Sequence, residues 1–271
     1  MIDDTLYDYN FLKSDKKLGL TVIVDGVNVY DKCNADLIDY EVVPATINKD
    51  IYKHLGKHDY RLNSFSLGEM LLNLSFYLGA DTQHNAFMNL NNLLSLFLNK
   101  IPIIKIGDTD FEYVCVIESS DVVHTTVKHY YKVDLVLNAI KRLSLVSLTF
   151  DNTTSTKKIK YSGSIPCGIN IVFVTNKNNS TVRFKLNDGE QYTFYKTNED
   201  YNTFNIDGIK GKILAATSYN NYVSGNTVNW FLNTDIIDFP KLVYGENTLQ
   251  ILTQLSDIQN IKVEYYPLFV I

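Results

Sequence analysis

Long stretches of alternating apolar and polar residues constrain this fold more than any other feature of the sequence. In EMLLNLSFYL, residues 69–78, apolar side chains from Met70 to Leu78 fall on one face, and Asn73 and Ser75 fall on the other. The same period recurs in FEYVCVIE (111–118) and YYKVDLVLN (130–138). Successive side chains of a β-strand point to opposite faces, so this pattern predicts strands with one buried face.

One segment has a helical period instead. DTQHNAFMNLNNLLSLFLNKIP, residues 81–102, predicts a helix over 83–99, with Asp81 or Thr82 as the N-cap and Pro102 just beyond its last turn. We interpret its stripe as a core face, the alternative being a docking face for a partner helix. The stripe consists of Ala86, Phe87, Leu90, Leu93, Leu94, Phe97 and Leu98.

The composition and pattern of the sequence change after residue 150. The polar stretch DNTTSTKK is followed by short apolar runs, with turn signals at Asp188-Gly189 and Asp207-Gly208. This pattern predicts a β-sandwich with strands near 158–161, 169–175, 181–186, 190–195, 203–206, 212–217, 227–232, 248–252 and 261–266. We therefore expect two domains, 1–150 and 151–271.

Composition narrows the class of protein. The chain has 271 residues, and its 25 basic and 30 acidic side chains give 25 − 30 = −5, which argues against a surface that neutralises nucleic-acid phosphates. No apolar run approaches the ~20 residues of a membrane span, and the acidic start lacks the features of a signal peptide. We expect a protein made and kept in a reducing cytoplasm. The isolated Cys33, Cys115 and Cys167 are then small buried hydrophobic residues.

No catalytic or metal-binding constellation emerges from the sequence. His54 and His58 have a zinc-like spacing, but Gly56 lies between them and an exposed loop is the favoured interpretation. Trp230 is interpreted as a half-buried core residue inside a strand rather than as a platform for sugars. We expect no catalytic residue, cofactor or metal, and a protein that is not an enzyme.

The order of the segments resembles a known family. The relevant segments are LTVIVDGVNVYDKC (20–33), the strand–helix–strand series over 67–122, SGSIPCGINIVFV (162–174), FPKLVYGENTLQIL (239–252) and IKVEYYPLFVI (261–271). Together they resemble the distal tail proteins of siphophages, the Dit family. The residues that occupy the family's structural motifs are Asp25, Gly26, Phe239, Pro240, Leu242, Gly245 and Asn247. The stretch 34–63 is less similar.

The resemblance implies a mainly β fold and a structural role. It implies an N-terminal β-barrel or sandwich with one amphipathic helix and a C-terminal galectin-like β-sandwich, which a turn at Gly245-Glu246-Asn247 helps to close. Members form a homo-hexameric ring around a DNA channel in the virion tail tip. The ring joins the tail tube protein to a tail-associated lysin or tail-tip hub protein, and in many phages anchors receptor-binding proteins. It implies no cofactor and no membrane. The alternative is a carbohydrate- or receptor-binding β-sandwich protein, which leaves the first half without a role.

Overall fold

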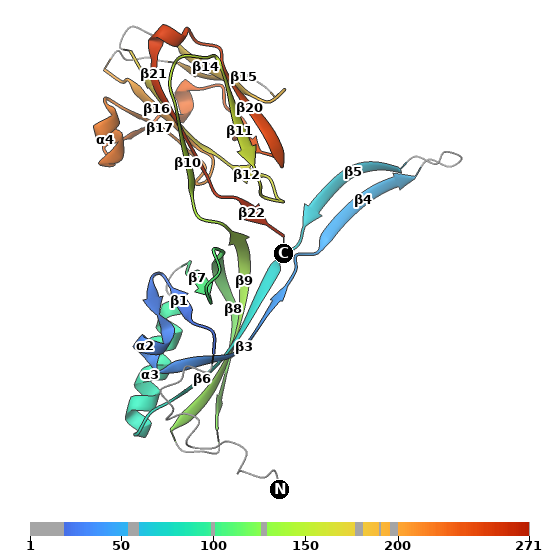
Figure 1. Cartoon of the computed structure of the whole chain (residues 1–271), viewed down its shortest axis with the longest axis vertical. Helices are drawn as coiled ribbons and strands as arrows, with labels where there is room; N and C mark the ends of the chain where they lie inside the picture. Colours follow the sequence, from blue (N-terminus) through green and yellow to red (C-terminus); the bar gives the residue numbers. More distant parts are fainter. Residues whose placement is uncertain are drawn as a thin grey trace. The chain divides into compact units, whose positions relative to one another are not determined.

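The computed structural model describes residues 19–53, 60–98, 101–125, 129–176, 181–189, 191–195 and 200–270. The chain divides into two compact units: unit 1 comprises Met1–Lys141 with Val270–Ile271, and unit 2 comprises Arg142–Phe269. Figure 1 shows that strands dominate both units, which confirms the predicted mainly β class. The predicted histidine pair, His54 and His58, lies outside the described residues.

Unit 1 is built on one sheet with strand order β2–β1–β7–β8–β9–β6–β3. Its central pair is β6 and β9, in register from Met70↔Ala139 to Gly79↔Tyr130. The alternation in β6 is confirmed, because its apolar face is buried throughout. The strands are β1 (Val22–Val24), β2 (Val27–Asn28), β3 (Ala35–Val43), β6 (Met70–Gly79), β7 (Ile103–Ile106), β8 (Glu112–His124) and β9 (Tyr130–Arg142).

A separate hairpin, β4 (Ile47–Lys53) and β5 (Tyr60–Leu67), connects β3 to β6 along the chain. Its two strands pair with each other in an antiparallel register that shifts between Asp50 and Ile51. β4 and the start of β5 lie in the stretch 34–63, whose expected resemblance to the distal tail proteins is loose, and the two strands carry no alternation as clear as that of β6.

The predicted helix is confirmed as α3 (Gln83–Leu98). The Thr82 hydroxyl oxygen accepts a hydrogen bond from the Asn85 N–H at 3.2 Å, so Thr82 is the N-cap. A short helix, α2 (Val29–Cys33), was not predicted, although Asn28 is a good capping residue and its side chain does cap the helix.

The buried stripe of α3 is narrower than the sequence suggests. Ala86, Leu90, Leu93 and Phe97 are buried, and Leu94 packs partly against the same core. Phe87 is 52% exposed and Leu98 is 54% exposed, so their inclusion in the core stripe was wrong. Both lie at the margin of the apolar arc, where helical spacing alone does not separate a core position from a boundary position.

Replacing Leu93 with Ala should destabilise unit 1, because Leu93 is fully buried and truncation leaves a cavity between α3 and the sheet. The expected loss in the free energy of unfolding is about 2–5 kcal/mol, measured by urea unfolding. Phe87→Ala on the same helix is the matched control and should change it by less than about 0.5 kcal/mol. Equal effects of the two variants would contradict this assignment of the buried face.

Unit 2 is a sandwich of two sheets, as predicted. The larger sheet has the order β10–β21–β13–β16–β17–β18, and the smaller has the order β11–β20–β14–β15. The strands of the larger sheet are β10 (Val146–Phe150), β13 (Asn170–Thr175), β16 (Thr203–Asp207), β17 (Lys212–Ala216), β18 (Val228–Asn229) and β21 (Ile258–Tyr265). Those of the smaller are β11 (Thr156–Tyr161), β14 (Thr181–Leu186), β15 (Gln191–Tyr195) and β20 (Gly245–Ile251).

The remaining elements of unit 2 are short. The strands β12 (Cys167–Gly168) and β19 (Lys241–Leu242) pair with each other, and β22 (Leu268–Phe269) lies near the end of the chain. The helical elements are α4 (Tyr219–Val223), η2 (Phe231–Asn233) and η3 (Leu255–Asp257). No helix that the structure describes, in either unit, is both long and apolar enough to cross a bilayer.

Aromatic residues from both sheets fill the core of the sandwich. Phe173 of the larger sheet lies 5.1 Å from Phe184 of the smaller sheet, ring centre to ring centre, and Phe194 lies 5.5 Å from Phe204. Trp230 is 5% exposed and packs on Phe204, which confirms a core role. Its predicted place inside a strand over 227–232 is wrong, because β18 ends at Asn229 and η2 begins at Phe231.

The boundary between the units shifts from the expected residue 150 to Arg142. The reason is β10, which pairs with β21 from Val146↔Tyr265 to Phe150↔Ile261 and so belongs to the sandwich. The two ends of unit 2 are also joined. The Leu143 N–H donates to the Pro267 carbonyl at 3.0 Å, and the Arg142 guanidinium lies 3.9 Å from the centre of the Tyr266 ring.

A fragment of residues 142–269 should fold as a soluble monomer, because it keeps every strand of the sandwich. A fragment starting at residue 151 lacks β10 and exposes the edge of β21, which favours aggregation. Size-exclusion chromatography with light scattering and circular dichroism will compare the two. Equal folding and solubility of the two fragments would mean that β10 is dispensable.

Candidate assembly surfaces

Strand β8 leaves a long open edge in unit 1. It pairs with β7 only through Tyr113 and Val114, and the last contact on that side is the hydrogen bond from the Cys115 N–H to the Pro102 carbonyl. From Val116 to His124, no strand that the structure describes pairs with this edge. The open segment spans roughly 30 Å at a rise of ~3.4 Å per residue.

The exposed side chains of this segment include several apolar ones. Val116 is 52% exposed and Val123 is 48% exposed, and Val122 is exposed as well. An open edge with exposed β-branched side chains is a template for another strand. We therefore treat 116–124 of β8 as a candidate assembly edge.

The opposite end of the same sheet is formed by β3. It pairs with β6 on one side, and no strand within the described residues pairs with its other side. A β-bulge at Ile38 interrupts the register between Leu37 and Asp39, and such bulges bend a strand and increase its twist. The sheet thus has two different open edges, the segment 116–124 of β8 beyond the end of β7 and the outer edge of β3.

The face of this sheet opposite the buried core is acidic. The register places Asp36, Asp39 and Glu41 of β3 on this face, because their partners on β6 are the polar residues Tyr77, Ser75 and Asn73. Asp134 of β9 joins them, accepting a hydrogen bond from the Ser75 hydroxyl at 2.5 Å. Below, these four acidic residues are called the acidic face.

One described cation, Lys132, lies among these carboxylates. Lys132 forms an ion pair with Asp134, with 2.8 Å between the charged atoms. The hydrogen bond to Asp134 raises the pKa of Lys132, and the charges of Asp134, Asp121 and Asp39 add to the effect. Lys132 is thus already paired, and carboxylates next to it disfavour the binding of phosphates.

An apolar loop follows β18 in unit 2. Leu232 is 94% exposed, Ile237 is 85% exposed and Tyr244 is 78% exposed, although Ile236 between them is buried. Because three large apolar side chains are exposed within one short segment, we treat this segment as a candidate contact surface for another protein. We call residues 231–244 the apolar loop.

The motif residues of the sequence occupy different units. Asp25 and Gly26 form the turn between β1 and β2, with φ angles of 50° and 81° that match a two-residue hairpin turn. In unit 2, Phe239 packs partly against the core, Pro240 is buried, and Leu242 is fully buried opposite Cys167. These residues fix the backbone and do not form a common site.

The turn expected at Gly245-Glu246-Asn247 is not formed. These residues begin β20, where Gly245 pairs with Tyr161 of β11. Gly245 has a φ of 100°, so a glycine is needed there for backbone reasons even though nothing crowds its side-chain position. The expected turn was wrong, because Gly245, Glu246 and Asn247 pair with β11 as the first residues of a strand.

Asn247 instead joins two segments of unit 2 through hydrogen bonds. It is fully buried, and its amide group donates to the carbonyls of Val243 at 2.7 Å and Gly245 at 3.2 Å. Its carbonyl oxygen accepts from the Val243 N–H and from the Asn187 amide group, each at 3.0 Å. Asn187, in turn, accepts from the Thr248 N–H. The two asparagines thus join the end of the apolar loop to the turn after β14.

The cysteines form no reactive centre among the described residues. Cys33, Cys115 and Cys167 are free and buried, as expected. Burial raises the pKa of the Cys115 thiol to about 12 and those of Cys33 and Cys167 to about 11. Thiols with such high pKa values are poor nucleophiles.

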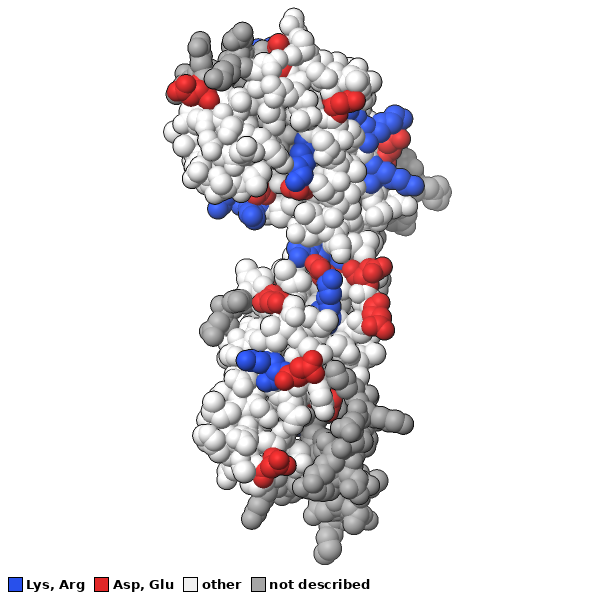
Figure 2. Space-filling model, turned by 60° about the vertical axis from the view of Figure 1, so that its left-hand side comes forward, with Lys and Arg blue, Asp and Glu red and all other residues white. Residues whose placement is uncertain are grey.

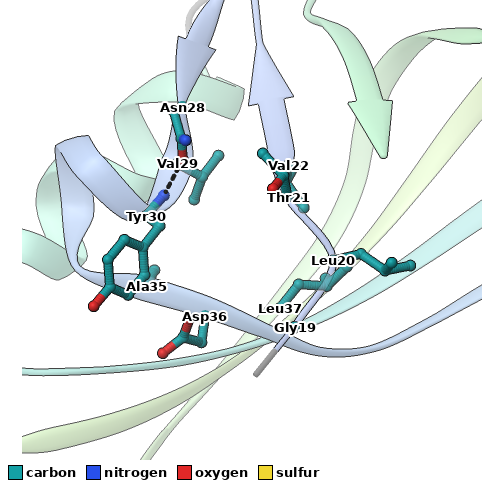
Figure 3. A pocket seen from close by; sticks show the side chains of 10 residues that line it. All are labelled: Gly19, Leu20, Thr21, Val22, Asn28, Val29, Tyr30, Ala35, Asp36 and Leu37. Atoms are coloured by element: carbon teal, nitrogen blue, oxygen red, sulfur yellow. Dashed lines mark hydrogen bonds between the residues drawn. The ribbon is translucent and has the colours of Figure 1, made fainter. Parts of the chain in front are cut away.

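The small cavity of unit 1 is too small for a ligand. Figure 3 shows it between β1, α2 and β3, with the hydrogen bond from the Tyr30 N–H to Asn28 at one side. Its volume of about 10 Å³ is no more than one water needs. The described residues also contain no cluster of three histidine, cysteine or acidic side chains suited to a metal.

Comparison with solved structures identifies the fold of the chain. The crystal structure of SPP1 Dit, described as a paradigm of the hub adsorption apparatus in Gram-positive infecting phages, superposes with a TM-score of 0.67. The match covers 92% of this chain and 99% of SPP1 Dit at 14% sequence identity. The chain has the Dit fold.

The resemblance seen in the sequence is therefore confirmed for the fold. Chains of the phage p2 baseplate in its activated conformation also match, with TM-scores of 0.55 and 0.53 and identities of 8% and 9%. Each match covers 91% of this chain and 97% of the baseplate chain. No family model and no curated protein matches the chain in sequence.

Asn247→Ala should destabilise this Dit-fold chain, because it removes the hydrogen bonds that a fully buried amide makes with Val243, Gly245 and Asn187. A hydrogen bond contributes about 0.5–1.5 kcal/mol, so the loss of these bonds should cost more than about 2 kcal/mol in urea unfolding. Exposed Asn220→Ala is the control and should be nearly neutral. An unchanged free energy of unfolding in Asn247→Ala would contradict the role of Asn247 in joining these segments.

Proposed function

We propose that this chain is a distal tail protein, a structural and non-enzymatic subunit of a phage tail tip. The observation that carries the proposal is the whole-length match to SPP1 Dit, which spans both units and leaves 1% of that chain uncovered. A carbohydrate- or receptor-binding sandwich would account for unit 2 only. The strand–helix–strand organisation of unit 1 then has no role.

In this proposal unit 1 assembles into a hexameric ring. Identical subunits close into a ring when one surface meets a different, complementary surface on the next copy. The sheet of unit 1 offers two such edges, the segment 116–124 of β8 and the edge of β3. Pairing β8 of one copy with β3 of the next would continue the sheet around the ring, and the bulge at Ile38 supports the curvature.

The acidic face would line the channel through which DNA passes. Each phosphate that a protein neutralises adds salt-dependent affinity for DNA, and a conduit must avoid this. Asp36, Asp39, Glu41 and Asp134 would repel phosphates, and Lys132 beside them is paired with Asp134. In Figure 2, acidic and basic side chains are interspersed on the visible face, which shows no continuous basic surface.

The partners would follow from the position in the tail. The ring would join the tail tube protein on one side and a tail-associated lysin or tail-tip hub protein on the other. Unit 2, which we propose is galectin-like, would present the apolar loop to a receptor-binding protein or another tail component. The exposure of Leu232, Ile237 and Tyr244 supports a protein contact there. The protein would be located in the virion tail tip, after synthesis in the host bacterial cytoplasm.

Val122→Lys should prevent ring formation without unfolding the protein. Val122 is exposed on the open edge of β8, and an added lysine there opposes strand pairing. The measurement is multi-angle light scattering at high concentration, together with electron microscopy of tail tips assembled with this chain. We expect six-fold rings with the wild type and none with Val122→Lys.

Ile209→Lys, on an exposed site of unit 2, is the matched control and should assemble normally. Both variants should melt at the wild-type temperature. Six-fold rings that form equally well with Val122→Lys, or that form through unit 2 alone, would refute the role assigned to unit 1.

A further inference from the structure

The outer face of the smaller sheet of unit 2 carries a cluster of basic side chains. Strands β11, β20, β14 and β15 alternate between core residues and residues that point away from the core. At the outward positions of these strands, as far as the structure describes them, Glu246 of β20 is the one acidic residue. The outward cations lie on β11 and β14, and we call them the basic face: Lys158, Lys160, Arg183 and Lys185.

The strand pairing arranges these cations in two rows. Lys158 and Lys160 lie on β11, whereas Arg183 and Lys185 lie two strands away on β14, because β20 pairs with both strands. Outward neighbours on one strand are roughly 7 Å apart, and strands two places apart are separated by roughly 10 Å. The cations therefore form an extended array on a sheet surface.

Three of the four cations are available to a ligand. Lys158 forms an ion pair with Glu246, with 2.8 Å between the charged atoms, and the two side chains are 70% and 59% exposed. Lys160, Arg183 and Lys185 form no ion pair with a carboxylate of the described residues. With one acidic residue among four cations, the charge of this face is 4 − 1 = +3, although the net charge of the whole chain is −5.

Protection of a sheet edge explains only part of this charge. β11 forms one edge of the smaller sheet, and lysines on an edge strand discourage pairing with other chains. β14 lies between β20 and β15, so Arg183 and Lys185 have no edge to protect. Like charges at neighbouring positions of a sheet repel one another. A cluster of cations on an internal strand therefore favours an anionic ligand.

The neutral residues between the two rows narrow the class of anion. The outward residues of β20 beside Glu246 are Thr248 and Gln250, whose side chains donate and accept hydrogen bonds. They supply neither the large apolar side chains that anchor a protein interface nor an aromatic ring on which a nucleic-acid base could stack. A guanidinium such as that of Arg183 binds phosphate oxygens through two parallel hydrogen bonds. Phosphates joined by a backbone without bases fit these side chains best.

We propose that the basic face binds a linear phosphodiester polymer whose repeating unit carries no aromatic base. Successive phosphates contact Lys160, Arg183 and Lys185, and the groups that join the phosphates form hydrogen bonds with Thr248 and Gln250. The inference goes beyond the proposed structural role and does not depend on it, because the basic face belongs wholly to unit 2 and the candidate assembly edges belong to unit 1.

The test is titration of the full-length protein with a synthetic glycerol-phosphate oligomer, followed by calorimetry at several salt concentrations. We expect saturable binding that weakens as salt rises, with a slope of about −2 to −4 for log affinity against log salt if three or four phosphates are contacted. The triple variant Lys160→Gln, Arg183→Gln, Lys185→Gln should lose about tenfold or more in affinity at low salt, together with most of this slope.

The triple variant Lys210→Gln, Lys212→Gln, Lys241→Gln is the matched control, because it removes three exposed cations of unit 2 that lie outside the smaller sheet. It should bind like the wild type, and both triple variants should keep the wild-type melting temperature. Val122→Lys should also bind normally, whether or not rings form. The proposal is overturned if the oligomer does not bind, if the control weakens binding as much as the basic-face variant does, or if polyglutamate or duplex DNA binds as tightly as the oligomer.

Discussion

The one-sided burial of a single sheet is the constraint on which unit 1 depends. The face of β6 from Met70 to Leu78 and its partner face on β9 are covered by α3, whose Leu93 and Phe97 are fully buried. Only one helix of this length covers the sheet within the described residues, so the other face and the outer edges must be stable in water or be covered by another chain. Their polar and acidic residues are consistent with the first requirement, and the exposed Val116, Val122 and Val123 of β8 are consistent with the second.

The sequence was informative where one local period decides the structure. The alternation of β6 and the helical spacing of α3 each follow from a single burial face, and both were predicted almost to the residue. The predictions were wrong where packing against a segment distant in the chain determines the structure. Phe87 has helical spacing but lies beside the core, and β10 belongs to unit 2 because of its pairing with β21, more than a hundred residues away.

The candidate assembly surfaces could not be predicted from the sequence. How much of the β8 edge is open depends on where β7 ends, which no local pattern in the sequence gives. The asparagine pair illustrates the same limit. Asn247 was recognised as a motif residue, but its partner Asn187 is distant in sequence and is joined to it only in the folded sandwich.

The joined ends of unit 2 have a consequence for how such proteins diverge. Leu143 and Pro267 are hydrogen-bonded, so the sandwich starts and finishes at one point on its own surface. Domains with adjacent ends can be inserted or replaced with little disturbance of the host chain. Recombination that exchanged residues 143–267 for another sandwich with adjacent ends would preserve β8, β9 and α3. In the proposed role, such an exchange would replace the whole sandwich while leaving the candidate assembly edges of unit 1 unaltered.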